Sequence, residues 1–210
     1  MNVVNQPRWR ALLKAVGDRL LDTVFGMDTA RPVPLEQLEF DAHDGLQYWP
    51  SNWLNLLVLR RILGSLNISR EDVFIDLGCG KGVVLFIAAH YPFGRIIGLD
   101  ISGSMLRIAR NNMARNMRRF ACSDFEFVAA NALDYAFPSD VTVCYYFNSF
   151  ARPVLETVVA NIEASVAAHP RAVTFVSLQG TMDEVLLGHG FRVVRRIRYL
   201  TVYKSEPSGD

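Results

Sequence analysis

A glycine-rich segment has the residue types needed to bind a polar ligand against bare backbone. It reads VFIDLGCGKGVVLFIAAH over residues 73–90, so that Asp76 precedes Gly78, Gly80 and Gly82 between two apolar runs. Glycine permits a sharp turn, and the missing side chain leaves room for a ligand beside the N–H groups at a helix start. Asp76 adds a carboxylate that can receive an ammonium group, directly or through water.

Two further segments carry polar side chains at expected strand ends. Asp100 lies 24 positions after Asp76, and a carboxylate there can accept hydrogen bonds from both hydroxyls of a ribose. Its alternative role is to cap a helix that begins near Ser102. In AANALDY, the amide of Asn131 could bond the edge of an adenine, or Asp134 its amino group. Either residue could equally serve only to form a turn.

The ligand is distinguished from a dinucleotide by two features of this pattern. A dinucleotide site must hold an anionic pyrophosphate at the turn, where the Asp76 carboxylate would repel it. The spacing GCGKG also differs from the dinucleotide pattern GxGxxG. Both features favour S-adenosylmethionine over NAD. No His, Cys or Asp cluster has metal-ligand spacing, so no metal is expected.

A fourth segment, VTVCYYFNSF over residues 141–150, ends with aromatic and amide side chains. In open α/β sheets ligands bind beyond the carboxyl ends of the strands, where the strand order reverses. Asn148 and Phe150 are therefore expected to face the reacting group, and Tyr146 is a candidate for orienting a substrate.

The elements that position these residues alternate from Asp72 onward. Short β-rich runs, apolar on both faces, alternate with helical segments, which is typical of a parallel sheet covered by helices. The strands are expected at 73–76, 95–100, 125–130, 141–147 and 172–178, and the helices at 82–90, 103–118, 152–168 and 181–188. Residues 191–204 have no helix after them and predict two strands or a bent hairpin, which adds an antiparallel strand to the sheet edge.

The N-terminal part predicts helices rather than strands. Apolar residues recur at steps of three or four from Arg8 to Phe25, and Ser51 could cap a second helix that ends near Gly64. We therefore expect a helical extension or lid over residues 1–65, a core over 66–204 and a flexible tail over 205–210.

Together these segments resemble the class I, seven-strand S-adenosylmethionine-dependent methyltransferases. IDLGCGKG is similar to the first motif of that family, GLDIS to its acidic second-strand end, ANALD to its adenine loop and YYFNSF to its fourth-strand motif. The resemblance implies an α/β, Rossmann-like doubly wound fold with a mostly parallel seven-stranded sheet, an antiparallel terminal strand and an N-terminal helical extension. It implies that S-adenosyl-L-methionine is held by Asp76, Gly78, Cys79, Gly80, Asp100, Ile101, Asn131, Ala132, Asn148, Tyr48 and Ser51.

A narrower likeness concerns QYWPSNW, over residues 47–53. It is similar to an element of some lysine-modifying class I enzymes and of small bacterial methyltransferases, and this analogy puts Tyr48 and Ser51 over the methionine end of the cofactor. The same residues could instead form an aromatic-anchored loop. Asn148 is followed by Ser149 rather than by the prolines typical of amine-directed enzymes, so the motif assigns no amine acceptor.

The expected function is methyl transfer from S-adenosylmethionine to an unidentified acceptor, either a protein or peptide amine or a small molecule. Asn148, Tyr48 and Tyr146 are the candidate catalytic residues, and His43 is either a base or a surface residue. Two other functions stay open. The chain could be a catalytically inactive S-adenosylmethionine-binding partner protein, or an NAD-dependent oxidoreductase.

Composition limits the partners expected for the chain. Its 210 residues contain 22 basic and 21 acidic side chains and have a net charge of +1, so no nucleic-acid partner is expected. The arginines of residues 107–120 are accordingly interpreted as a solvated helix face. Apolar stretches are too short for a membrane span, and three scattered cysteines indicate a reducing, cytoplasmic location. The composition does not indicate an oligomeric state.

Overall fold

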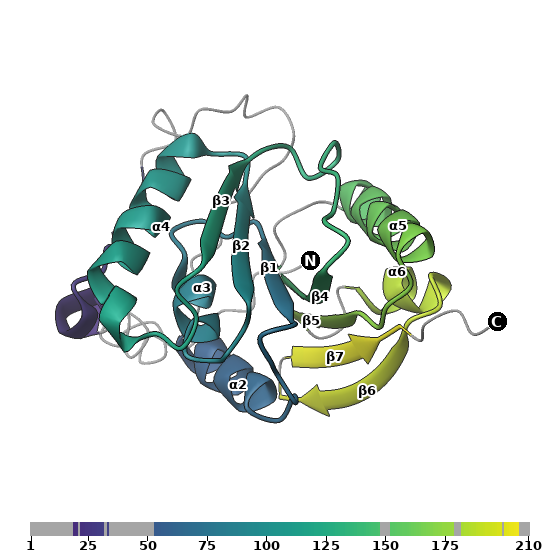
Figure 1. The fold of residues 1–210 in the computed structure, drawn as a ribbon, viewed down its shortest axis with the longest axis horizontal. Helices are drawn as coiled ribbons and strands as arrows, with labels where there is room; N and C mark the ends of the chain where they lie inside the picture. The colour runs from purple at the N-terminus through teal and green to yellow at the C-terminus, as the bar shows by residue number, and fades with distance from the viewer. Residues whose placement is uncertain are drawn as a thin grey trace, which may run out of the picture.

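The computed structural model describes residues 19–20, 22–31, 33, 53–147, 152–178, 182–198 and 200–205. Its centre is a seven-stranded sheet with the order β3-β2-β1-β4-β5-β7-β6 (Figure 1). The strands are β1 (Val73–Leu77), β2 (Arg95–Asp100), β3 (Phe125–Ala129), β4 (Val141–Tyr146), β5 (Thr174–Leu178), β6 (Arg192–Ile197) and β7 (Leu200–Lys204). The helices are α2 (Trp53–Leu63), α3 (Val83–Ala88), α4 (Gly103–Asn116), α5 (Arg152–Ala168) and α6 (Asp183–Gly188), with a 3₁₀ turn η3 (Met117–Arg119) after α4.

The predicted α/β fold class is confirmed. Strands β1 to β5 pair in parallel, β7 pairs antiparallel with both of its neighbours, and each strand lies within a few residues of the range that the sequence predicts. The strand order reverses between β1 and β4, whose carboxyl ends therefore flank the turn that follows β1.

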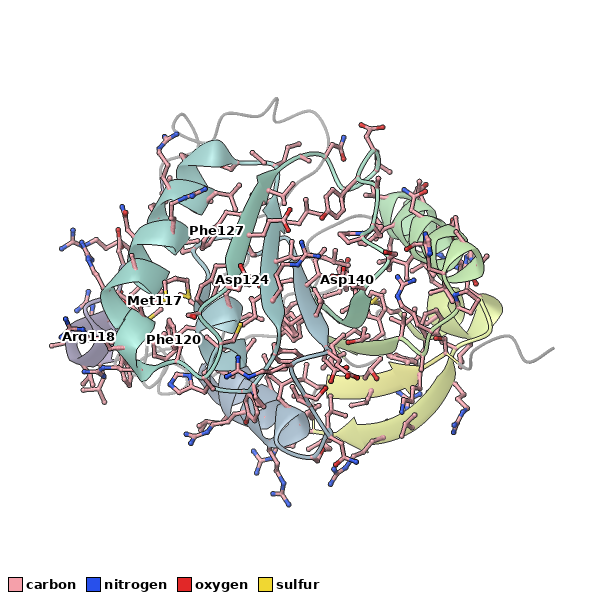
Figure 2. All side chains as sticks on the ribbon, viewed as in Figure 1. Met117, Arg118, Phe120, Asp124, Phe127 and Asp140 are labelled. Carbon is pink, nitrogen blue, oxygen red and sulfur yellow. The ribbon has the colours of Figure 1, made fainter. Side chains whose placement is uncertain are left out.

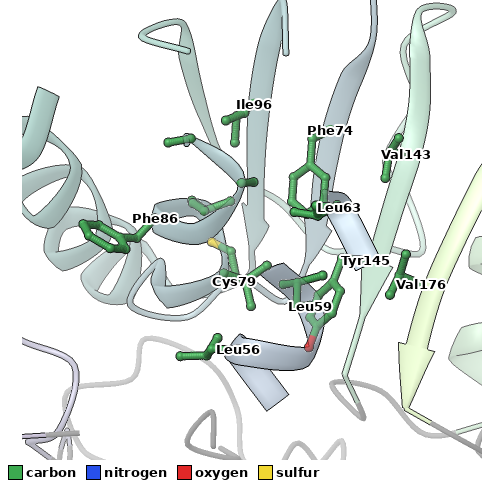
Figure 3. Close-up of a cluster of buried hydrophobic side chains, with 14 of the residues drawn as sticks. Leu56, Leu59, Leu63, Phe74, Cys79, Phe86, Ile96, Val143, Tyr145 and Val176 are labelled. Carbon is green, nitrogen blue, oxygen red and sulfur yellow. The ribbon is translucent and has the colours of Figure 1, made fainter. Parts of the chain in front are cut away.

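Helices cover both faces of the sheet (Figure 1). Because successive strand residues point to opposite faces, Phe74 of β1 joins the cluster under α2, α3 and α4. Its neighbour Ile75 joins the cluster under α5 and α6. Figure 3 shows the first cluster, in which Tyr145 of β4 lies beside Leu59 and Leu63 of α2. Helix α2, which the sequence assigns to the N-terminal extension, thus packs in the main core.

The C-terminal hairpin differs in one respect from its predicted arrangement. The antiparallel strand β7 does not form the sheet edge but lies between β5 and β6. The first four residues of β7 are buried, whereas β6 has only exposed and half-buried residues and carries three arginines. Since an edge strand has one solvated side, the more apolar strand takes the interior position and the arginine-rich strand becomes the edge.

The described part of the N-terminal region packs against α3 and α4. Residues 22–25 are helical, and the ring centroids of Phe25 and Phe86 of α3 lie 4.9 Å apart. The predicted start of this helix and most of the following loop lie outside the described residues. Among the described residues, no helix is long and apolar enough to cross a membrane.

Candidate functional site

The turn between β1 and α3 has the backbone conformation that its glycines predict. Gly78, Gly80 and Gly82 have φ angles of 83°, 51° and 82°, in the left-handed region that other residues enter only with strain. The backbone N–H groups of Gly78 and Cys79 both donate to the carbonyl of Leu99, at 2.9 and 3.0 Å. The glycine turn is thereby fixed against the end of β2.

Asp100 closes this arrangement from the end of β2. One of its carboxylate oxygens accepts the Gly80 N–H at 2.7 Å, and the other accepts the Ser102 N–H at 2.9 Å. Burial raises the pKa of Asp100, and the backbone N–H groups oppose that rise. The side chain that caps α4 belongs to Ser102, which accepts from the Met105 N–H at 3.3 Å. Each carboxylate oxygen of Asp100 has a second lone pair left for a ligand hydroxyl.

Asp76 is the second carboxylate beside the turn. It pairs with Tyr145 in the β1–β4 register and is only 3% exposed. Burial, together with the nearby charge of Asp100, raises the pKa of Asp76 well above its usual value. No hydrogen-bond donor from the described residues reaches its carboxylate, so an ammonium group fits the chemistry of this position.

The structure places the other cofactor candidates on the same rim with different exposure. Ile101 follows Asp100 and is 36% exposed, whereas Ala132 is buried. Asn131 is exposed, and its side-chain oxygen accepts the Leu133 N–H at 3.1 Å. Asn131 therefore forms a local turn, which was one of the two roles that the sequence predicted for it. Its amide nitrogen takes no part in that bond.

Two candidates point into packed regions. The Cys79 side chain is 6% exposed, and a Cβ added to Gly98 of β2 would lie 3.0 Å from the Cys79 sulfur. Cys79 thus lines the site with its backbone, while its side chain packs against β2. Tyr146 is 1% exposed, in the cluster under α5. Tyr48, Ser51, His43, Asn148 and Phe150 lie outside the described residues.

Lys81, within the glycine turn, is a residue whose role the sequence reasoning missed. Its side chain is 1% exposed, and its ammonium group donates to the Asp28 carboxylate at 3.2 Å and to the Arg31 carbonyl at 2.7 Å. This ion pair fixes residues 28–31 against the turn. A lysine between two glycines has no periodicity that would indicate a partner 53 positions away.

Asn112 of α4 completes the same contact. It is fully buried, and its side-chain oxygen accepts the Asp28 N–H at 2.9 Å while its side-chain nitrogen donates to the Lys81 carbonyl at 3.0 Å. A polar residue on the core side of a helix was a usable signal, because a buried amide needs partners for both its oxygen and its nitrogen.

The site therefore offers a permissive backbone turn, a carboxylate with two free lone pairs and a second buried carboxylate. This donor set fits S-adenosylmethionine, which presents a ribose and an ammonium group, better than an anionic pyrophosphate. Among the described residues, no group of three or more His, Cys, Asp or Glu side chains could hold a metal ion.

Comparison with known proteins gives a family for this part of the chain. Residues 74–168 match the family described as "Methyltransferase domain". The chain is 33% identical over 60 residues to a protein-lysine N-methyltransferase of Saccharolobus islandicus, a match that covers 28% of this chain and 37% of that protein. It is 25% identical over 144 residues to a ribosomal protein L11 methyltransferase of Cupriavidus pinatubonensis, covering 67% and 42%.

Another relative corrects the partner expected from composition. The chain is 28% identical over 100 residues to a ribosomal RNA large subunit methyltransferase G of Psychromonas ingrahamii, covering 47% of this chain and 26% of that protein. The expectation that nucleic acid is excluded is therefore wrong, because net charge averages over the whole surface and does not describe one face of it. The matched segments span less than half the length of these curated relatives.

A solved structure supports the fold independently. The PH0226 protein of Pyrococcus horikoshii OT3 superposes with a TM-score of 0.58 at 15% identity, covering 84% of this chain and 100% of that chain. At this identity the likeness shows the fold alone. Strand order and glycine turn agree with a Rossmann-like fold, and residues 74–168 of that fold match the methyltransferase domain family.

Proposed function

We propose that this protein transfers a methyl group from S-adenosylmethionine to an acceptor. The carrying observation is the Asp100 carboxylate, which two backbone N–H groups hold beside the glycine turn with a lone pair left on each oxygen. In this proposal those lone pairs accept the two ribose hydroxyls, the exposed side chain of Ile101 contacts the adenine, and Asp76 receives the ammonium group. When bound, the cofactor supplies an electrophilic methyl group.

The protein's own contribution is to position the acceptor and to exclude water. Of the extension predicted over residues 1–65, only the part before α2 is proposed as the lid for this step, because α2 packs in the core whereas Lys81 and Asn112 hold residues 28–31 beside the glycine turn. Tyr48, Ser51 and Asn148 stay predictions for the groups that contact the cofactor and the acceptor. Tyr146 is proposed only to support the end of β4, since its side chain is buried.

The names of the relatives favour a macromolecular acceptor. They refer to lysine in a protein, to ribosomal protein L11 and to ribosomal RNA. We therefore place a protein amine or a nucleic acid ahead of a small molecule. The cytoplasmic location stays a prediction from the sequence.

Titration calorimetry with S-adenosylmethionine, S-adenosylhomocysteine and NAD tests the cofactor. We expect micromolar binding of the first two, with a loss of affinity of about 100-fold or more in Asp100→Ala, since two charge-assisted hydrogen bonds disappear. Asp140→Ala is the matched control, because that carboxylate is 52% exposed and pairs with Arg95. Binding of NAD alone would support the oxidoreductase alternative.

Transfer of a tritiated methyl group tests turnover. The protein is incubated with labelled S-adenosylmethionine and ribosomes, and the protein and RNA fractions are counted separately. Label in either fraction that Asp100→Ala abolishes supports the proposal and identifies the acceptor class. Cofactor binding without label in either fraction or in small molecules would favour the inactive binding protein.

A further inference from the structure

The arginine face of α4 and η3 is defined here as Arg107, Arg110, Arg115, Arg118 and Arg119. Residues 103–120 contain these five basic side chains and no acidic one, in a chain whose net charge is only +1. All five are exposed. Figure 2 shows Arg118 in η3, just after the C-terminal end of α4.

These arginines differ from others in the molecule in their pairing. Arg95 pairs with Glu126 and Asp140, and Arg152 pairs with Glu156 and Glu184. Among the described residues, no carboxylate forms an ion pair with the four arginines that follow Arg107 in this face, which are Arg110, Arg115, Arg118 and Arg119. Like charges three or four positions apart destabilise a helix, so these four arginines, which have no ion pair among the described residues, are unfavourable for the helix itself.

The two carboxylates of the described residues 22–31 are held in other contacts. Asp28 is bound to Lys81, and Asp22 accepts hydrogen bonds from Thr29 and Ala30. Among the described residues, the positive field of Arg110, Arg115, Arg118 and Arg119 is therefore open to an external anion.

Two of the arginines are fixed over aromatic rings. The guanidinium carbon of Arg110 lies 5.0 Å from the ring centroid of Phe127, and that of Arg119 lies 5.2 Å from the ring centroid of Phe25. The Arg115 guanidinium donates to the Gly26 carbonyl at 2.8 Å. Fixed guanidinium groups lose little side-chain entropy when they bind a phosphate, and their planar donors match its oxygens.

The geometry points to the sugar-phosphate backbone of a nucleic acid as the partner of this face. Arg110 to Arg118 span about 12 Å along the helix axis, and one strand carries a charge about every 3.4 Å. Helix α4 begins directly after Ser102, whose N–H donates to Asp100, so a strand along the arginine face leads toward the glycine turn. This inference rests on the proposed function, because it names the class of acceptor that the domain would hold.

Fluorescence anisotropy of a labelled 20-nucleotide RNA, with a DNA of the same sequence in parallel, tests the inference. We compare the whole protein with Arg110→Gln/Arg118→Gln and with the control pair Arg60→Gln/Arg61→Gln, which removes the same charge from exposed positions at the end of α2. We expect the face variant alone to lower affinity several-fold and to reduce the slope of log K against log salt by about 1.4 for a single strand. Binding of RNA but not DNA would identify the source of the phosphates.

Equal losses in both variant pairs, or absence of binding by the unchanged protein, would overturn the inference. Displacement of the RNA by an acidic peptide at equal charge concentration would overturn it in favour of an acidic protein partner. Titration with S-adenosylhomocysteine in the same samples separates the two proposals. Cofactor binding without nucleic-acid binding refutes only the arginine face, and the reverse result refutes only the proposed methyl transfer.

Discussion

Charged side chains are arranged differently in two regions of the molecule, the glycine turn after β1 and the helices α5 and α6. At the glycine turn, Lys81 is 1% exposed and bonds both a carboxylate and a backbone carbonyl. On α5, Arg152 is 61% exposed and pairs with Glu156 of the same helix and Glu184 of α6, which are 50% and 76% exposed. A buried cation needs its partners because water cannot replace them, whereas exposed pairs exchange readily with water. The ion pair at the turn therefore determines local structure, whereas those on α5 and α6 do not.

The largest effect is expected from Lys81→Met. It removes two hydrogen bonds of a buried charged group, so we expect a loss of about 3 kcal/mol in the free energy of unfolding, measured by urea denaturation. Hydrogen exchange of residues 22–31 should accelerate as well, since their attachment to the turn is lost. Unchanged exchange in this segment would show that Asn112 alone is sufficient to hold it.

A second prediction compares two glycines with similar φ angles, one in the glycine turn and one just after α6. Gly82 has φ 82° and an added Cβ would lie 3.0 Å from Ala109 Cβ, whereas Gly190 has φ 75° and no atom within 4 Å. Gly190→Ala should therefore cost about 1 kcal/mol for the left-handed backbone alone, and Gly82→Ala about 2 kcal/mol or more. Equal costs would mean that α3 and α4 move apart freely at this contact.

Asp76→Asn should raise the stability of the protein instead of lowering it. Burial and the charge of Asp100 raise the pKa of Asp76 in the folded state. The contribution of Asp76 to the free energy of unfolding is therefore complete below its unfolded pKa and is lost as pH rises through its folded pKa. The variant should melt at a higher temperature than the unchanged protein at pH 8, with the difference shrinking toward pH 4. Calorimetry should show weaker S-adenosylmethionine binding in the same variant. A constant difference across this pH range would contradict the assignment.

The smallest effect is expected from Arg152→Met. Its pairs with Glu156 and Glu184 are exposed, so we expect no measurable change in the melting temperature at 150 mM salt. Because this substitution introduces the same side chain as Lys81→Met, the two variants measure directly how burial changes the value of an ion pair. A loss comparable to that of Lys81→Met would remove the distinction between the two regions.

The sequence alone determined the fold class and the glycine turn. Alternation of apolar runs and helical periods is local, and it located the strands from Val73 to Leu178 within a few residues. The spacing of Gly78, Gly80 and Gly82 determined the turn because only glycine adopts three positive φ angles so closely together without strain. Asp100 was predictable because the carboxyl ends of neighbouring parallel strands share one sheet edge.

Tertiary structure alone decided which side chains meet over long sequence separations. Lys81 bonds a segment 50 to 53 positions away, and no local pattern indicates that contact. The burial of Tyr146 and the interior place of β7 depend on competition among apolar surfaces for one core. The sequence shows the arginines of residues 107–119 as a run. Only the packed structure shows that no carboxylate of the described residues forms an ion pair with four of them. Sequence encodes local conformation through residue type, whereas distant pairing is fixed only when the whole chain is compact.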